Sequence, residues 1–182
     1  MKLALAFLLP FAALAADPLS DPAEVVVAMK KATTFYTTQL AFHGGYASAW
    51  SKDLSIAKVE GHEGKTLISI QPPGTTTVGM ACLKAFQATG DVQFLEAAKG
   101  AAQALIDCQL ASGGWDSDFD FSEEGKKKYL LHSDASAGAA SKDKKRNSST
   151  LDDNKTQSAL LFLLELAYLP ESKANQALQD CL

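Results

Sequence analysis

A duplicated stretch constrains the fold of this chain more than any other feature of its sequence. Gln39–Trp50 (QLAFHGGYASAW) and Gln109–Phe121 (QLASGGWDSDFDF) both begin with Gln-Leu-Ala and continue, after a slip of one residue, into Gly-Gly-aromatic. A helix follows each copy, one opened by Gly74–Thr76 and the other by Asn154–Thr156. Because a helical pair cannot bury its apolar face alone, such units stack or close into a ring. The repeat therefore predicts a mostly all-α fold, an (α/α) toroid built from repeated helical hairpins with short β excursions.

Apolar residues spaced three or four apart predict the helices of these hairpins. We expect a first helix over Asp21–Leu40, capped by its aspartate, two helices that meet at Gly90, and a strongly apolar helix over Thr156–Leu169. The alternating, β-rich Thr66–Ile70 predicts a short strand. Two units and the start of a third, from Glu171, do not close a ring. We therefore expect a toroid that is incomplete at its C-terminus; a small open helical domain is the alternative.

The N-terminus predicts export. Residues 1–16 combine Lys2, an apolar run and a small-residue cleavage site, which is the pattern of a secretory signal peptide. The run is too short to span a membrane and no other candidate span follows, so we expect no membrane partner. The prediction is a secreted or periplasmic monomer with one domain over residues 17–182, which carries a polar surface loop at residues 134–149.

The acidic character of the chain limits its partners. The formal net charge is −4, and it becomes more negative once Lys2 is removed. An exported acidic protein is a poor candidate for binding nucleic acid. It also repels an anionic polymer unless a cation or a local basic patch intervenes.

Common catalytic motifs are absent from the sequence. There is no nucleophilic-serine elbow, no HExxH and no phosphate-binding glycine loop. The histidines lie far apart, and we expect each to be structural or exposed rather than catalytic: His43, His62 and His132. Cys82, Cys108 and Cys181 have no paired metal spacing. Cys82 and Cys108 fall on helical faces, where we expect buried free thiols; a disulfide between them is the alternative.

Three aspartates alternate after the second Gly-Gly turn. On extended chain Asp116, Asp118 and Asp120 share one face, because strand side chains alternate with period two, and Trp115 and Phe119 lie on the other. We take Asp116 and Asp118 as candidate metal ligands. The alternative is that they are solvated turn residues.

A second acidic pair, Asp152 and Asp153, stands at the corresponding place before the last predicted helix. If the repeats share a rim, both groups converge there, and hard oxygen ligands of this kind suit Ca²⁺. The helix N-terminus at Thr156 can also hold an anionic group. A helix cap is the alternative role for either aspartate.

Aromatic rings beside carboxylates are typical of sugar sites, where a ring packs on a pyranose face. Tyr46 and Trp115 follow the two Gly-Gly turns and are therefore candidate substrate-binding residues, together with Asn154 and Thr156. For any one aromatic residue, burial in the core is the commoner role.

Three stretches carry a family resemblance. They are QPPGTTTVGMACLKAFQATGD (Gln71–Asp91), QLASGGWDSDFDF (Gln109–Phe121) and STLDDNKTQSALLFLLEL (Ser149–Leu166). In this order they resemble the pectic acid lyase family, the α/α-toroid pectate lyases of polysaccharide lyase family 10, over most of the mature chain. The last stretch is the most telling, because the family carries a comparable Asp-Asn/Asp…Thr-Gln helix start at its active rim.

The resemblance implies Ca²⁺-dependent β-elimination of polygalacturonate. Calcium would bridge enzyme carboxylates and the uronate carboxylate, while an arginine takes the proton at C5. By that likeness Asp152, Asp153 and Asn154 are the best candidates for the calcium and substrate side. The aspartates of the second Gly-Gly turn come next.

The chain also departs from the family. The family's catalytic arginine lies in a later part of its domain, whereas the only arginine here is Arg146, which stands in the polar loop and matches no motif. The catalytic base is therefore not identified. On this reading the chain is an enzyme, an inactive piece of one, or a protein that binds without cleaving.

Two other readings remain open. The spacing of Gln109, Gly113 and Trp115 also resembles the Gln…Gly-x-Trp repeat of squalene and terpene cyclases, in which it ties the helices of a toroid. A cyclase needs a protonating acidic motif in an apolar cavity, and the Asp-rich, secreted character argues against it. A non-catalytic glycan-binding toroid is the second alternative, and it would keep the aromatic residues and the acids without turnover.

Overall fold

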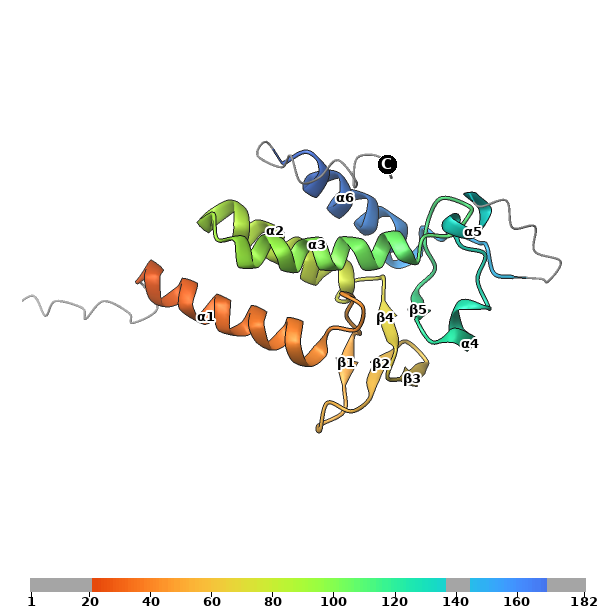
Figure 1. Ribbon diagram of the computed structural model, residues 1–182, viewed down its shortest axis with the longest axis horizontal. Helices are drawn as coiled ribbons and strands as arrows, with labels where there is room; N and C mark the ends of the chain where they lie inside the picture. Colours follow the sequence, from red (N-terminus) through yellow and green to blue (C-terminus); the bar gives the residue numbers. More distant parts are fainter. Residues whose placement is uncertain (1–20, 137–144, 170–182) are drawn as a thin grey trace, which may run out of the picture.

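The computed structural model describes residues 21–136 and 145–169 (Figure 1). Its α-helices are α1 (Pro22–Phe35), α2 (Thr75–Thr89), α3 (Val92–Asp107), α4 (Glu123–Lys126), α5 (His132–Ser136) and α6 (Lys155–Ala167). A π-helical turn η2 (Tyr36–Leu40) extends α1, and a 3-10 turn η3 (Asp152–Asn154) precedes α6. The strands are β1 (Ala49–Trp50), β2 (Ala57–Val59), β3 (His62–Gly64), β4 (Leu67–Ser69) and β5 (Asp118–Asp120). The predicted signal peptide and the helix predicted from Glu171 lie outside the described residues.

The fold is mixed α/β, and the predicted all-α toroid is wrong. Strands β1, β2 and β3 form one antiparallel sheet, and β4 pairs with β5 in a second. In the second sheet Leu67 lies opposite Asp120 and Ser69 lies opposite Asp118. Backbone donors and acceptors need partners, so the extended stretches that follow the two Gly-Gly turns pair across the repeat. The predicted β excursions are therefore parts of shared sheets and do not decorate a ring of helices.

The predicted helix boundaries are confirmed where the structure describes them. The Asp21 carboxylate accepts a hydrogen bond from the Ala23 N–H at 2.9 Å at the start of α1. Gly90, with a φ of 70°, ends α2 in the left-handed conformation that suits glycine. Asp91 caps α3 by accepting from the Gln93 N–H at 3.0 Å. The predicted strand at residues 66–70 is β4.

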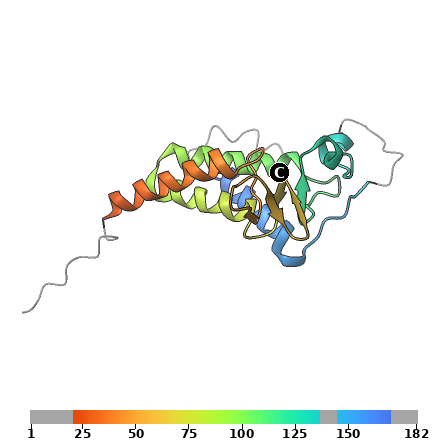
Figure 2. The same cartoon turned by 90° about the horizontal axis from the view of Figure 1, so that it is seen from below.

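The core lies where α2, α3 and α6 pack together, with the two sheets at one end of these helices (Figures 1 and 2). The buried stripe of α3 is rich in alanine and so allows close approach. On α2, a Cβ added to Gly79 would stand 2.4 Å from the Phe162 ring of α6, which shows how tightly these helices meet. In contrast, α1 buries none of its side chains.

The two Gly-Gly-aromatic turns share a matching pair of hydrogen bonds, here called the threonine clamp. Thr75 Oγ1 accepts from the Tyr46 N–H at 2.9 Å and donates to the Tyr46 carbonyl at 3.2 Å. Thr156 Oγ1 makes the same two contacts with Trp115, at 3.3 Å and 3.4 Å. All four residues are buried. Each Gly-Gly-aromatic turn is therefore tied to the start of the helix that completes its hairpin.

The thiols are structural. Cys82 and Cys108 are free and buried, as expected, and the alternative disulfide between them is not formed. Burial raises the pKa of both thiols, so both are protonated and poorly nucleophilic. Cys181 lies outside the described residues. Across residues 21–136 and 145–169, no helix combines the length and apolar character needed to cross a bilayer.

Candidate functional site

Strand β5 brings two of the alternating aspartates into one cavity of about 200 Å³, here called the Asp118 pocket. The polar and charged residues that line it are His62, Glu63, Asp118, Asp120, Lys128, Tyr129 and Arg146. Phe119, between the two aspartates, is buried in the hydrophobic core. The predicted alternation of acids and aromatic residues is therefore confirmed along this strand.

Asp118 forms a pair with His62, the first residue of β3. The Asp118 Oδ2 atom lies 3.1 Å from His62 Nδ1, with side-chain exposures of 10% for the aspartate and 57% for the histidine. Burial raises the pKa of Asp118, and the pairing with His62 opposes that shift. Because an ionised carboxylate only accepts, Nδ1 is the donor of this hydrogen bond. The Nε2 atom is then the nitrogen available to a ligand.

Arg146 lines the same pocket, and two backbone hydrogen bonds hold its main chain in place. Its N–H donates to the Lys128 carbonyl at 2.8 Å, and its own carbonyl accepts from the Leu130 N–H at 2.9 Å. Its Nη1 atom lies 3.4 Å from Asp116 Oδ2 and donates to the Tyr129 hydroxyl at 3.3 Å. Asp116, and next the Tyr129 hydroxyl, raise the pKa of the guanidinium, so Arg146 is held protonated while its side chain stays 57% exposed.

Asp120 is held by hydrogen bonds at the floor of the pocket. Its Oδ1 atom accepts from the Thr66 hydroxyl and, at 2.9 Å, from the Ser122 N–H. Burial acts to raise its pKa, but these hydrogen bonds outweigh burial and lower it. The two pocket aspartates therefore differ: the pKa of Asp118 lies above the ordinary value and that of Asp120 lies below it.

The loop predicted at residues 134–149 is anchored where its end is described. The Asn147 side-chain oxygen accepts from the Ser112 N–H at 2.7 Å, and the hydroxyls of Ser149 and Ser112 lie 2.7 Å apart. The start of the predicted loop, in turn, belongs to α5. These contacts fix the segment against the second Gly-Gly turn and so carry Arg146 to Asp116. The expectation of a polar surface loop missed this role.

The second predicted acidic group lies in the short turn η3. Lys155 Nζ stands 4.0 Å from Asp152 Oδ2 and 3.6 Å from Asp153 Oδ2. The lysine side chain is only 7% exposed, whereas the two aspartates are 77% and 60% exposed. A resident ammonium group therefore faces this pair. Asn154 lines a different cavity, of about 380 Å³, between α2 and α6.

The helix-cap alternative for the acidic pair does not describe this turn. Asn154 is the N-cap residue of α6, and its side chain makes no capping hydrogen bond. Asp152 Oδ1 accepts from the Asp153 N–H at 3.1 Å, within the turn itself. Asp153 and Asn154 both adopt the left-handed conformation, with φ of 47° and 58°. The two left-handed residues therefore set the course of the chain into α6, and neither aspartate caps the helix.

The four predicted metal ligands do not form one calcium site as they are arranged. Asp116 faces Arg146, Asp118 faces His62, and Asp152 and Asp153 face Lys155. Within the described part of the chain, no three histidine, cysteine or acidic side chains are grouped to hold a metal ion. We therefore derive no step through calcium, and calcium binding stays a prediction for experiment.

The predicted substrate-binding aromatic residues belong to the core. Tyr46 and Trp115 are each 1% exposed, and the Trp115 indole donates to the Leu105 carbonyl at 2.8 Å. A ring that stacks on a sugar needs an exposed face, and neither ring presents one. Thr156, also a predicted substrate-binding residue, is buried and engaged in the threonine clamp.

The two predicted acidic groups approach the same turn. The Thr150 N–H donates to the Trp115 carbonyl at 3.1 Å, so the segment that leads to Asp152 lies against the turn that leads to Asp116. Asp118 and Asp120 line the Asp118 pocket, whose lining includes neither Asp152 nor Asp153. The sequence predicted the aspartates as site residues but did not predict His62 and Tyr129. Each of these two residues stands alone in the sequence and belongs to no motif that could have indicated a site.

Comparisons with known proteins add no family to this picture. No protein-family model, no curated protein and no solved structure matches the chain. The resemblance to pectate lyases therefore rests on the three sequence stretches.

Proposed function

We propose that this protein is a secreted pectate lyase-like enzyme that binds a uronate unit of polygalacturonate in the Asp118 pocket and cleaves the polymer by β-elimination. The observation that supports this best is the position of Arg146. Its protonated guanidinium is more than half exposed and lies beside the Asp118–His62 pair. A guanidinium matches the geometry of a carboxylate and binds it through two parallel hydrogen bonds.

The local charge makes Arg146 the group that meets an anionic ligand. The chain is acidic overall, with a formal net charge of −4, so a polyanion needs a local cation to approach it. Lys128 and Arg146 line the Asp118 pocket together with three acids, Glu63, Asp118 and Asp120. The uronate carboxylate is therefore bound by the exposed guanidinium of Arg146 and not by a surrounding basic patch.

The chemistry divides between Arg146 and His62. Arg146 neutralises the uronate carboxylate and stabilises the negative charge that develops when the C5 proton leaves. His62 Nε2 takes that proton, and Asp118 orients the imidazole and stabilises its charged form. The electron pair of the C5–H bond forms the C4–C5 double bond and expels the glycosidic oxygen from C4, which takes a proton from water. Asp116 holds Arg146 protonated, so the arginine acts as an anion binder and not as the base.

Turnover tests the catalytic part of the proposal. The whole protein with polygalacturonate should release unsaturated uronides, which absorb in the near ultraviolet. His62→Gln should lower kcat by about 100-fold or more, as loss of a general base does, while binding stays unchanged. His132→Gln is the matched control, because His132 lies outside the Asp118 pocket. Binding without any turnover in the unaltered protein would favour the non-catalytic glycan-binding alternative.

Binding tests the role of Arg146 and separates it from a calcium bridge. Arg146→Ala should weaken trigalacturonate binding by about tenfold or more, since hydrogen bonds to charged groups are the strong ones. Lys84→Ala is the matched control, because it removes a paired cation elsewhere, at Glu165. Asp116→Asn should strengthen binding, because it frees the guanidinium from its ion pair. If Asp116 is instead a calcium ligand, the same variant weakens binding and removes its calcium dependence.

A further inference from the structure

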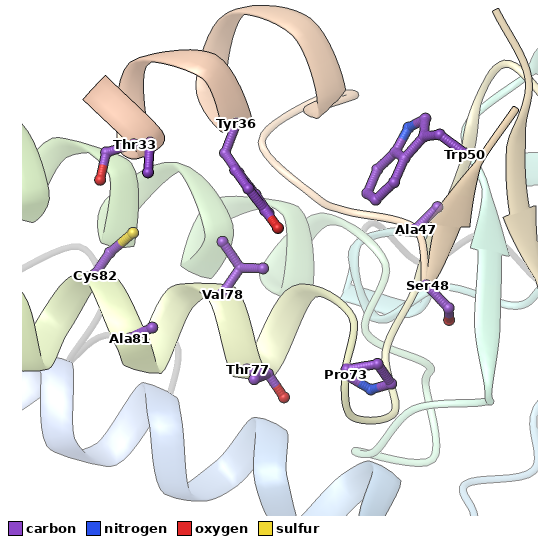
Figure 3. Close-up of a pocket in the computed structure, with 11 residues that line it drawn as sticks. Thr33, Tyr36, Ala47, Ser48, Trp50, Pro73, Thr77, Val78, Ala81 and Cys82 are labelled. Carbon is purple, nitrogen blue, oxygen red and sulfur yellow. The ribbon is translucent and has the colours of Figure 1, made fainter. Parts of the chain in front are cut away.

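A second cavity, of about 420 Å³, lies between α1, α2 and the first sheet, and is here called the Trp50 pocket (Figure 3). Figure 3 shows the Tyr36 ring extending from the end of α1 toward Val78 of α2, with the Trp50 indole extending from β1 toward the same space. Both rings are partly exposed, unlike the core rings of Tyr46 and Trp115. The rings that can stack on a ligand are therefore here.

The walls of the Trp50 pocket carry no charge. They combine the two rings with small apolar side chains and three hydroxyl-bearing residues: Thr33, Ser48 and Thr77. A charged ligand loses hydration on entering such a pocket and gains no compensating partner. The ligand that fits is therefore neutral.

Several polar groups on these walls have no partner among the described residues. Within residues 21–136 and 145–169, the hydroxyls of Thr33, Ser48 and Thr77 form no hydrogen bond, and neither do the Tyr36 hydroxyl and the Trp50 indole N–H. A purely apolar ligand would bury these groups unpaired, which is costly. A neutral ligand that carries hydroxyl groups satisfies them.

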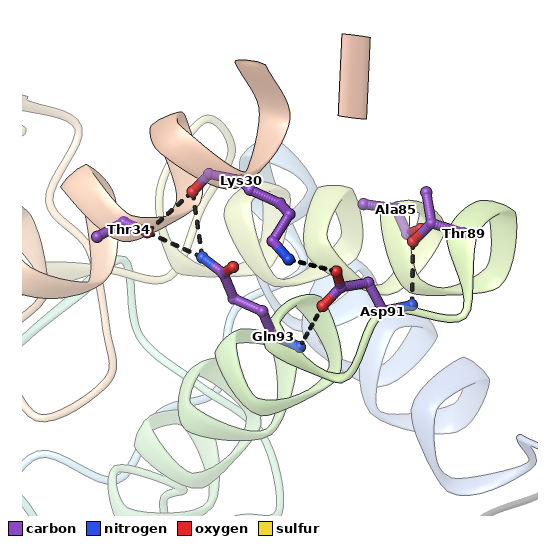
Figure 4. A network of polar contacts seen from close by, with 6 residues as sticks. All are labelled: Lys30, Thr34, Ala85, Thr89, Asp91 and Gln93. Carbon is purple, nitrogen blue, oxygen red and sulfur yellow. Dashed lines mark hydrogen bonds and ion pairs between the residues drawn. The ribbon is translucent and has the colours of Figure 1, made fainter. Parts of the chain in front are cut away.

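The α1 wall of the pocket is held in place by polar contacts with α3. Helix α1 buries no side chain and is tied to the start of α3 by polar contacts (Figure 4). Lys30 Nζ lies 2.6 Å from Asp91 Oδ2, and the Gln93 side-chain nitrogen donates to the Lys30 carbonyl at 3.1 Å and to the Thr34 hydroxyl at 2.9 Å. These contacts hold the C-terminal half of α1 and so position Tyr36 at the pocket.

We propose that the Trp50 pocket binds a neutral pyranose ring, such as a hexose unit or a methyl-esterified uronate unit. Trp50 and Tyr36 pack on the apolar ring faces, and the wall hydroxyls bond the sugar hydroxyls. The volume lies in the range of small-ligand pockets. This site takes the uncharged counterpart of the ligand proposed for the Asp118 pocket, and it does not rest on that proposal.

The test compares two matched probes, trigalacturonate and its fully methyl-esterified form. The chain has two tryptophans, and Trp115 is buried with its N–H bonded, so quenching of fluorescence by acrylamide reports on Trp50. The esterified trimer should protect Trp50 from quenching in the whole protein and also in the Arg146→Ala variant. Loss of this binding in Arg146→Ala would overturn the proposal, because the ester would then occupy the Asp118 pocket.

Calorimetry with the esterified trimer assigns the binding to the two rings and the hydroxyls. Trp50→Ala should weaken binding by about tenfold or more, as removal of an anchoring aromatic ring does, and Trp50→Phe should retain most of it. Thr77→Val, at an exposed helix position, should weaken binding by a few fold and keeps the fold intact. Ile56→Ala, outside the pocket, should leave the affinity unchanged.

Three further results would overturn the proposal. The first is unchanged affinity of the esterified trimer in Trp50→Ala. The second is equal protection of Trp50 by the charged and the esterified trimer. The third is displacement of the esterified trimer by N-phenyl-1-naphthylamine together with full affinity in Thr77→Val, which would mark a purely apolar site. Failure of trigalacturonate to bind anywhere would overturn only the function proposed for the Asp118 pocket.

Discussion

The two Gly-Gly-aromatic turns make the same buried contacts but lead to different surface pockets. In both, a threonine at the start of the next helix clamps the backbone of a buried aromatic residue, Tyr46 in the first turn and Trp115 in the second. Beyond the first turn the chain runs to Trp50 and an uncharged pocket. Beyond the second turn it runs to alternating aspartates and a pocket lined by side chains of both charges.

This difference separates scaffold from chemistry. In each copy of the repeat the structure buries the leucine, the second glycine and the aromatic residue, because buried polar groups of the backbone must be satisfied in the same way each time: Leu40, Gly45 and Tyr46 in the first copy, and Leu110, Gly114 and Trp115 in the second. The residues that differ between the copies line the cavities. A repeat therefore predicts the framework of this protein, and the departures from the repeat predict its ligands.

The largest expected effect comes from the glycines of the two turns, which adopt similar backbone conformations in different surroundings. Gly44 has a φ of 81°, and a Cβ added to it would stand 2.2 Å from the Gly100 carbonyl oxygen. Gly113 has a φ of 95° with nothing within 4 Å. Gly44→Ala should lower the free energy of unfolding by about 3 kcal/mol, since overpacking adds to left-handed strain, and Gly113→Ala by about 1 kcal/mol. Urea unfolding followed by tryptophan fluorescence measures both.

Equal losses in the two glycine variants would contradict the close approach of the first turn to α3. A large loss in Gly113→Ala alone would reverse the comparison. The same unfolding curve of Gly61→Ala supplies a control, because Gly61 has a positive φ of 74° and open space around it.

A medium effect is expected from the threonine clamps. Thr75→Val and Thr156→Val keep the side-chain shape but remove two hydrogen bonds to buried backbone groups. Each should cost about 1–2 kcal/mol of unfolding free energy, because the backbone donor is left unpaired. The cost should be larger for Thr75, whose contacts are 2.9 Å and 3.2 Å, than for Thr156, at 3.3 Å and 3.4 Å. Thr77→Val, whose hydroxyl has no partner within the described ranges, should cost almost nothing; a comparable loss there would undo the clamp interpretation.

The smallest effect is a dependence on pH that belongs to the second turn alone. Burial raises the pKa of Asp118 above its ordinary value of 3.8. Between that value and the raised one, the folded protein binds more protons than the unfolded chain, so its contribution to stability falls as the pH rises through this interval. Asp118→Asn removes this contribution, and its stability relative to the parent should therefore increase with pH across the interval. Thermal unfolding of both proteins from acid to neutral pH measures the difference, and a constant difference would show that the pKa is not raised.

Local structure could be predicted from the sequence where neighbours in the chain decide it. The cap at Asp21, the end of α2 at Gly90 and the strand β4 all follow from short-range rules. The alternation of acids and aromatic residues along β5 follows from strand geometry. These features depend on which face a side chain occupies, and periodicity reports that directly.

The fold class and much of the site could not be predicted because distant partners decide them. Nothing local in Thr66–Ile70 indicates that β4 pairs with β5, and this pairing turns a predicted ring of helices into a mixed fold. The aspartates that follow Trp115 led to the prediction that its ring binds a sugar. The ring is buried instead, and the threonine clamp holds its backbone. Arg146 stands in a polar tract whose composition indicated a surface loop, and contacts with the distant segments at Lys128 and Ser112 bring it to Asp116.

One measurement tests most directly the claim that a duplicated scaffold carries two chemically different pockets. Backbone amide shifts of the isotopically labelled protein can be recorded by nuclear magnetic resonance during titration with trigalacturonate and, separately, with its methyl-esterified form. The account predicts that the acid shifts the amides around Asp118, Tyr129 and Arg146, and that the ester shifts those around Tyr36 and Trp50. A single set of shifted amides for both ligands, or none in either region, would contradict it.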